Sequence, residues 1–136
     1  MIKLAGTVIL YNPQKNFIDN IKSYLCFLDK LYLVDNSEIK SQYIEDINNI
    51  NNAVYIFNNG NKGVAFGLNM ALKMALKDGY RFLLTMDQDS SFKDASIEKM
   101  IDFINNNNTS DVAIISPEIV VDNHIITDMN TPITSG

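Results

Sequence analysis

Cysteine is almost absent from this sequence, which has a single one, Cys26, among 136 residues. No disulfide can therefore form within the chain. Cys26 falls in an apolar pattern of helical spacing, where we expect a buried and unreactive thiol. A chain of this length can bury a continuous core without disulfides or structural metal, so we expect one domain over residues 1–136.

Long apolar segments are also missing. Apolar residues make up 46% of the chain, but they come in short periodic bursts that could not span a bilayer. The first residues, Met1 to Lys3, run directly into such a burst, without the separate regions of a secretion signal. We expect a cytoplasmic protein, with any peripheral contact to the inner face of the membrane made through parts not present in this sequence.

The sequence has no excess of positive charge. Its 16 acidic residues outnumber its 11 basic ones, which gives a net charge of −5. Binding to a nucleic-acid backbone normally needs a cationic surface, so nucleic acid is not an expected partner. An acidic protein can still bind a diphosphate if a divalent cation supplies the positive charge.

The apolar residues predict strands alternating with helices. The continuous apolar runs that predict strands are 4–10, 31–34, 53–57, 81–86 and 112–115. The segments of helical spacing are 17–28, 43–50, 64–76 and 94–104, the last with Asp94 as its cap. This alternation predicts right-handed crossovers and a three-layer, Rossmann-like α/β fold with a mainly parallel sheet.

The pattern weakens toward the C-terminus. After Pro117 it continues only as a short apolar run at 119–121, a lone His124 and a tail rich in Thr, Ser and Pro. The last predicted strand leads to Thr134-Ser135-Gly136 without a closing helix. We therefore expect an N-terminal fragment of a longer domain.

Polar segments follow four of the predicted strands. In chain order they are Tyr11-Asn12-Pro13, Asp35-Asn36-Ser37, the loop 58–63 and Asp87-Gln88-Asp89. In open parallel α/β sheets, ligands bind beyond the carboxyl ends of the strands. The sequence therefore predicts a binding site where these four segments meet.

Asp87 and Asp89 are spaced so that both carboxylates can face one site after the fourth predicted strand. Two such charges raise each other's pKa unless a cation lies between them. Mg²⁺ or Mn²⁺ is the natural occupant, because such an ion binds one or two carboxylates while phosphate oxygens and water complete its coordination. The alternative is a turn and helix-capping cluster, which is the commoner explanation for an isolated Asp-x-Asp.

Three further polar or aromatic residues are candidates for a nucleotide site. Asp35 could accept a hydrogen bond from N3–H of uracil or thymine, and Tyr11 offers a ring for stacking on a pyrimidine. Asn69 lies on the predicted helix that follows the Asn/Gly loop, where it could reach a ligand. Each also has a purely structural explanation: Asp35 as a turn former, Tyr11 as sheet-edge packing and Asn69 as an exposed side chain.

Taken together, these segments resemble family 2 glycosyltransferases of the GT-A fold, particularly the rhamnosyltransferase-like members. The resemblance extends over nearly the whole chain. The segments that carry it are Val8 to Pro13, Leu33 to Ser37, Asn58 to Ala65 with Asn69, and Leu84 to Ser90. The Asp-Gln-Asp form, together with Thr134-Ser135-Gly136 after a fifth strand, points toward rhamnosyl transfer within the family.

The resemblance implies roles for individual residues. Ile9 and Tyr11 would line the nucleoside pocket, and Asp35 would contact the pyrimidine. Asp87 would lie near the ribose, and the metal would be bound by Asp89 with Asp87. The full set of implied nucleotide-binding residues is Ile9, Tyr11, Asn12, Asp35, Asn61, Gly63, Asn69 and Asp87.

The resemblance also implies a reaction. An acceptor hydroxyl of a glycan or a lipid-linked saccharide would attack the anomeric carbon of dTDP-rhamnose or a UDP-sugar, with inversion, in the synthesis of bacterial surface polysaccharide. The metal would stabilise the leaving nucleoside diphosphate. The family carries its carboxylate base on a later segment, so the catalytic residue is unknown here and expected beyond Gly136. The fragment alone is expected to be inactive.

Two other functions remain as alternatives. A nucleotidyltransferase shares the sheet architecture, but it follows its first strand with a basic glycine-rich loop where this chain has Tyr11-Asn12-Pro13. A non-catalytic nucleotide-binding module would need the same binding residues as a transferase. A signalling receiver is disfavoured, because it needs paired acids after the first strand.

Overall fold

A computed structural model describes residues 2–93, 95–111, 119–121 and 124–126, with side chains for residues 2–93 and 95–111. The chain divides into two compact units. The larger unit contains Lys3–Lys93, and the smaller unit contains Met1–Ile2 and Asp94–Gly136. The expectation of a single domain stays a prediction.

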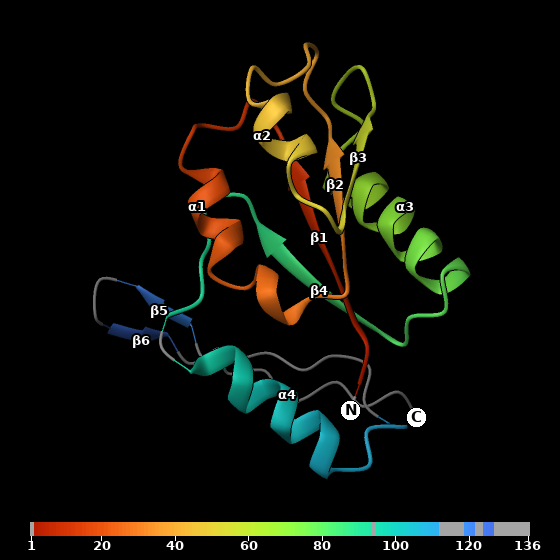
Figure 1. The fold of residues 1–136 in the computed structure, drawn as a ribbon, viewed down its shortest axis with the longest axis vertical. Helices are drawn as coiled ribbons and strands as arrows, with labels where there is room; N and C mark the ends of the chain where they lie inside the picture. The colour runs from red at the N-terminus through yellow and green to blue at the C-terminus, as the bar shows by residue number, and fades with distance from the viewer. Residues whose placement is uncertain (1, 94, 112–118, 122–123, 127–136) are drawn as a thin grey trace. The chain divides into compact units, whose positions relative to one another are not determined.

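The larger unit is built on a four-stranded parallel sheet (Figure 1). Its strands are β1 (Leu4–Leu10), β2 (Lys30–Asp35), β3 (Ala53–Phe57) and β4 (Phe82–Asp87). Their order is β3-β2-β1-β4, and every pairing is parallel. The first four predicted strands are confirmed to within one residue at each end. β1 is buried along almost all its length, which explains its continuous apolar sequence.

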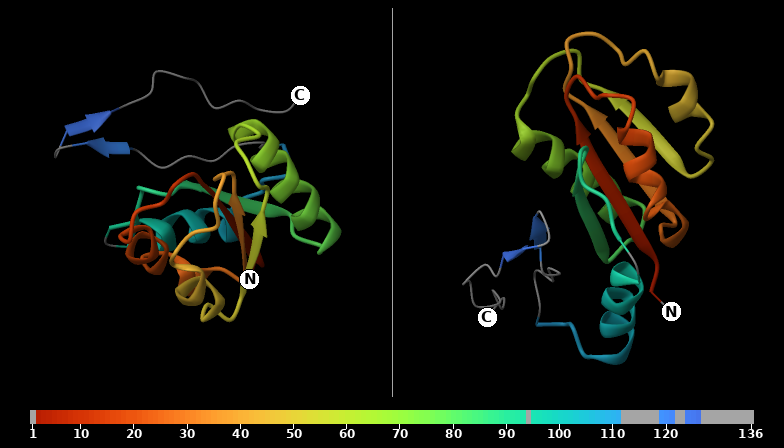
Figure 2. Two further views of the ribbon diagram at one scale, coloured as in Figure 1. Left: turned by 90° about the horizontal axis from the view of Figure 1, so that it is seen from above. Right: turned by 90° about the vertical axis from the view of Figure 1, so that its left-hand side faces the viewer.

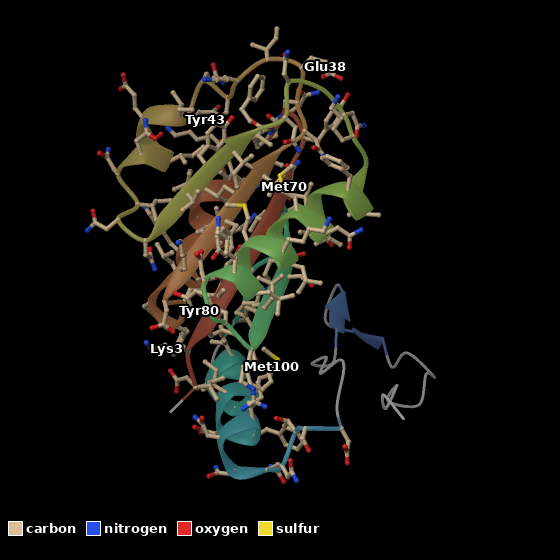
Figure 3. The ribbon with its side chains drawn as sticks, turned by 90° about the vertical axis from the view of Figure 1, so that its right-hand side faces the viewer. Lys3, Glu38, Tyr43, Met70, Tyr80 and Met100 are labelled. Carbon is tan, nitrogen blue, oxygen red and sulfur yellow. The ribbon has the colours of Figure 1, made fainter. Side chains whose placement is uncertain are left out.

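One face of the sheet is covered by α3 (Val64–Lys77), which lies along the strands in Figure 3. Gly67, Ala71 and Ala75 recur every four residues and form the buried side of this helix. A methyl group added to Gly67 would lie only 2.8 Å from Ile9 Cδ1. Glycine is therefore needed for the short distance between α3 and β1.

Short helices cover the other face of the sheet (Figure 2). They are α1 (Phe17–Lys22), the 3-10 helix η1 (Leu25–Phe27) and α2 (Ile44–Asn48). The buried apolar side chains of these helices and the segments beside them are Phe17, Ile21, Tyr24, Leu28 and Ile47. Helices on both faces of a parallel sheet confirm the predicted three-layer α/β fold.

Residues 17–28 do not form the single helix that their apolar spacing predicts. α1 ends at Lys22, and the chain then forms a turn and η1. Tyr24 and Leu28 are buried, but the tighter 3-10 turn between them directs Cys26 outward. The expectation of a buried thiol is therefore wrong, because Cys26 is exposed.

The smaller unit contains α4 (Ser96–Asn106), which buries Ile97 and Ile104. Its Asn105 Oδ1 accepts a hydrogen bond of 3.0 Å from the backbone N–H of Ile2. α4 confirms the helix that the sequence predicts at 94–104.

An antiparallel strand pair, β5 (Ile119–Val121) and β6 (His124–Ile126), follows in the smaller unit. The sequence pattern did not predict this hairpin. The predicted strand at 112–115, the cap Asp94 and the Thr134–Gly136 segment lie outside the described residues. Of the helices that the structure describes, none is long and apolar enough to cross a membrane.

A polar cluster closes the amino-terminal edge of the sheet. Asp78, just after α3, accepts hydrogen bonds from Tyr32 Oη and from Lys30 Nζ, the latter at 2.8 Å. The bonds from Lys30 and Tyr32 hold the pKa of the Asp78 carboxyl below its ordinary value of 3.8. The cluster therefore ties the end of α3 to the start of β2 in a charge-dependent way.

We expect Asp78→Asn to lower the free energy of unfolding at neutral pH and to make it less sensitive to acid. A carboxyl group with a lowered folded-state pKa stabilises the fold above its ordinary pKa. That contribution is lost as the pH falls through the folded-state value. Urea unfolding at neutral pH and at acid pH measures both effects, with Asp46→Asn, an exposed acid on α2, as control. A wild-type advantage over Asp78→Asn that is unchanged in acid would contradict the prediction.

Candidate functional site

The register of the parallel sheet brings the predicted polar segments to one edge. Leu10 pairs with Asp35, Ile9 pairs with Asp87, and Asp35 pairs with Phe57. The carboxyl ends of all four strands therefore lie in line, and the loops that follow them leave the sheet together. This carboxyl edge holds most of the candidate residues.

Asp35 ends β2 and is completely buried, with 0% of its surface exposed. Its Oδ1 accepts a 2.9 Å hydrogen bond from the backbone N–H of Ser37, and its Oδ2 accepts one from Tyr55 Oη. Burial, and then the hydrogen bond to Asp35, raise the pKa of the Tyr55 hydroxyl. A base donor can reach Asp35 only if a neighbouring side chain moves.

Asn36 and Ser37 continue the buried segment and bind the neighbouring loops. Asn36 Nδ2 donates to the backbone oxygen of Gly63 at 3.0 Å, and Asn36 Oδ1 accepts from Asn58 Nδ2 at 2.8 Å. Ser37 Oγ accepts from the backbone N–H of Asn12 at 2.7 Å. We call Asp35, Asn36 and Ser37 the carboxyl-edge cluster, because they join the loops after β1, β2 and β3.

The loops after β1 and β3 need backbone conformations that few residues adopt. Asn12 has a φ of 44° and Asn59 a φ of 53°, in the left-handed region that asparagine tolerates better than most residues. Gly63, at the start of α3, has a φ of 86°. Its N–H donates to Asn61 Oδ1 at 2.9 Å, so this loop is held by its own side chains.

Tyr11 follows β1 with its side chain 44% exposed, so a planar ring could stack on it. Its backbone is held by the side chain of Gln88. Tyr11 N–H donates to Gln88 Oε1 at 2.9 Å, and Gln88 Nε2 donates to the Tyr11 carbonyl oxygen at 3.1 Å. The middle residue of the Asp-Gln-Asp segment thus fixes the aromatic residue of a different loop.

Asp87 and Asp89 are both exposed at the end of β4. Among the described residues, neither carboxylate is engaged by a hydrogen bond or an ion pair. No three metal-binding side chains gather anywhere in the described part of the chain. Two free oxygen-ligand side chains fit a magnesium or manganese ion that takes its remaining ligands from diphosphate and water. The residues present therefore fit such an ion.

The remaining predicted residues lie on β1 and α3. Ile9 is half-buried and lies beneath Gly67, so its side chain joins the core on the α3 side of the sheet. Asn69 is exposed on α3 and, among the described residues, makes no hydrogen bond with another candidate. The carboxyl-edge cluster thus joins Asn12, Asp35 and Gly63, and Gln88 holds Tyr11 beside them, whereas Asn69 stands apart.

A cavity of about 240 Å³ opens beside this set, between the loops after β1 and β2. Asn12 and Ser37 contribute to its wall together with Lys40. A larger hollow of about 420 Å³ lies among α1, η1 and the turn before β3. That turn is at the opposite end of the strands from the candidate residues, so we give the larger hollow no part in the site.

Several residues of the site were not singled out in the sequence. Asn36 and Ser37 stood in a predicted turn, where their small polar side chains were the only signal. Gln88 lies between two aspartates, and the prediction of a metal site for this segment concerned only their carboxylates. Tyr55 carried no signal, because a tyrosine in an apolar strand is ordinary core sequence.

These features define a class of protein: a parallel, three-layer α/β domain with its candidate ligand site at the carboxyl edge of the sheet. The chain belongs to glycosyl transferase family 2, whose family model matches residues 8–131. No curated protein sequence matches the chain.

Solved structures support the same fold. The crystal structure of S. aureus TarS is similar to 77% of this chain, with a TM-score of 0.62 and 24% sequence identity. The similar region is 20% of the TarS chain, so the present sequence spans only a fraction of that protein's length. At this identity the likeness shows a GT-A-like Rossmann fold and nothing finer.

We expect Asn36→Ala to destabilise the larger unit by about 2–4 kcal/mol, because it leaves the Gly63 carbonyl and the Asn58 amide without their partner. Urea unfolding measures the loss. Asn58→Ala, which removes one of these bonds, should cost less. Asn51→Ala, at an exposed turn position, serves as the matched control. An Asn36→Ala variant as stable as the control would show that the carboxyl-edge cluster does not hold the loops.

Proposed function

We propose that this chain is the donor-binding part of a metal-dependent, inverting glycosyltransferase. It would bind a nucleoside-diphosphate sugar, whose sugar passes to a hydroxyl of a glycan or lipid-linked acceptor. The observation that carries the proposal is the meeting of four polar strand ends at one edge of a parallel sheet, in a chain of glycosyl transferase family 2.

The nucleoside end of the site would lie at the loop after β1. The exposed ring of Tyr11 supports stacking on the base, and the buried carboxylate of Asp35 supports a pyrimidine through its N3–H. A base can contact Asp35 only if the Tyr55 hydroxyl or a nearby loop moves. Asn61, Gly63 and Asn69 would contact the nucleotide from the other side.

The diphosphate end would lie at Asp87 and Asp89. Both carboxylates are exposed and free, as ligands for an incoming ion should be. Mg²⁺ or Mn²⁺ held there would stabilise the negative charge that develops on the leaving diphosphate. Asp87, next to Ile9 in the sheet register, would also lie near the ribose.

The Asp-Gln-Asp segment supports rhamnose as the donor sugar, with dTDP-rhamnose as the nucleotide sugar and a UDP-sugar as the alternative. The product would belong to a bacterial surface polysaccharide. We assign the acceptor base to none of the described residues. A nucleotidyltransferase is the weaker candidate, because the loop after β1 has an aromatic ring where that class has a basic glycine loop.

We expect nucleoside diphosphate binding to need a divalent ion and Asp89→Ala to abolish that need, because Asp89 is the proposed direct ligand. Calorimetry with UDP and dTDP, in Mn²⁺ and in EDTA, measures the dependence. Asp46→Ala, which removes an exposed acid from α2, is the control and should behave as the wild type. Equal wild-type affinity with Mn²⁺ and with EDTA would remove the metal from the proposal.

We expect Asp35→Ala to weaken UDP and dTDP binding by about 1–3 kcal/mol, because the base loses a buried partner. Tyr55→Phe separates this role from a structural one. It removes a hydrogen bond from Asp35 but leaves the carboxylate, so it should keep the preference for pyrimidines over GDP. If the wild type binds GDP as tightly as dTDP, Asp35 does not select the base.

A further inference from the structure

We propose that Gln88 is a positioning residue that couples the nucleoside end of the site, at Tyr11, to the metal end, at Asp87 and Asp89. This inference rests on the proposed function for its ligand. The contacts of Gln88 carry it independently of the family, because they join two loops that lie 77 residues apart in sequence.

The Gln88 side chain takes the place of a missing backbone pairing. β1 and β4 pair in parallel up to Ile9 and Asp87, where β4 ends. Beyond that point, the Gln88 amide accepts from Tyr11 N–H at 2.9 Å and donates to Tyr11 O at 3.1 Å. The two bonds satisfy both backbone polar groups of Tyr11, as a neighbouring strand would.

The backbone of Gln88 is fixed as well. Its carbonyl oxygen accepts a 3.1 Å hydrogen bond from Asn20 Nδ2 of α1. The carbonyl of Asp87 accepts a 3.1 Å bond from the N–H of Ser90, which closes the turn that carries both acids. A displacement of this turn therefore moves the amide that holds Tyr11.

Within the part of the chain that the structure describes, no other side-chain hydrogen bond links the two ends. Neither carboxylate of the Asp-Gln-Asp segment is bonded within the described residues, and the Tyr11 ring is open to solvent. Beyond the end of the β1–β4 pairing, Gln88 thus fixes the Tyr11 backbone relative to the turn that carries the acids. The separation between the Tyr11 ring and the two acids must match the distance from a base to its diphosphate. The two Gln88 bonds therefore favour a nucleotide in which both parts are present.

Glutamine is suited to this task because its amide offers a donor and an acceptor side by side. Gln88→Met keeps the length of the side chain but removes both groups. Gln88→Glu keeps an acceptor for Tyr11 N–H but places a carboxylate oxygen against the Tyr11 carbonyl.

The first test is a double-mutant cycle on the full chain, with UDP and dTDP affinities measured by calorimetry in Mn²⁺. We expect Gln88→Met to bind on the order of tenfold more weakly than the wild type. In a Tyr11→Ala background the same change should cost little more, because the ring that it positions is already gone. Asn107→Leu removes an exposed amide, which donates to the Phe103 carbonyl oxygen at 2.8 Å, and serves as the matched control.

The second test measures hydrogen exchange of the Tyr11 N–H, which the Gln88 amide protects. Gln88→Met should speed this exchange, whereas Gln88→Glu, which keeps the acceptor, should protect the N–H more than Gln88→Met does. Asn107→Leu should leave the exchange unchanged. A loss of binding through altered folding would instead speed exchange throughout the sheet.

The outcomes separate the inference from the proposed function. If the wild type binds neither nucleoside diphosphate, both are refuted. If it binds and Gln88→Met binds equally well, only the inference is refuted. Losses from Gln88→Met and Tyr11→Ala that simply add would also refute it, because they would show that Gln88 acts on the ligand or the fold without Tyr11. Equal exchange of the Tyr11 N–H in the wild type and in Gln88→Met would show that the amide does not hold the loop.

Discussion

A buried carboxylate costs free energy unless hydrogen bonds replace the water that it loses, and Asp35 at the end of β2 is such a group. Its bonds to Ser37 N–H and Tyr55 Oη meet that requirement, and Asn36 and Ser37 extend the network to the neighbouring loops. The hydrogen bonds of the carboxyl-edge cluster therefore fix the positions of the loops after β1 and β3. The geometry of the candidate site depends on this satisfaction of buried polar groups more than on apolar packing.

The two ends of the site differ in how far they are organised before a ligand binds. At the loop after β1, the cluster, the close approach of Gly67 to Ile9 and the Gln88 side-chain bonds hold backbone and core in place. At the other end, Asp87 and Asp89 stand free and exposed. In the proposed function, a rigid base pocket would lower the ordering cost of binding, and the free carboxylates would adjust to an ion and to phosphate oxygens that arrive together.

The sequence predicted what depends on local pattern and missed what depends on pairing across the fold. Four strands were predictable because buried parallel strands are continuous apolar runs, and their polar ends followed from the same boundaries. The end of α1 at Lys22 and the exposure of Cys26 were not predictable. Apolar spacing alone does not distinguish one long helix from a helix followed by a turn and η1. The partnerships of Asp35 with Tyr55 and of Gln88 with Tyr11 depend on strand order and register, which no local pattern contains.

The charge of the protein bears on the chemistry of its ligand. The carboxyl edge carries the exposed carboxylates of Asp87 and Asp89 and the buried carboxylate of Asp35, in a chain of net charge −5. Lys40 in the loop after β2 lies over the ring of Phe57, at 5.7 Å, which draws its charge toward an aromatic face. In the proposed function, a divalent ion would offset the repulsion between these two carboxylates and an incoming diphosphate. The ion would then take part in substrate recognition as well as in leaving-group stabilisation.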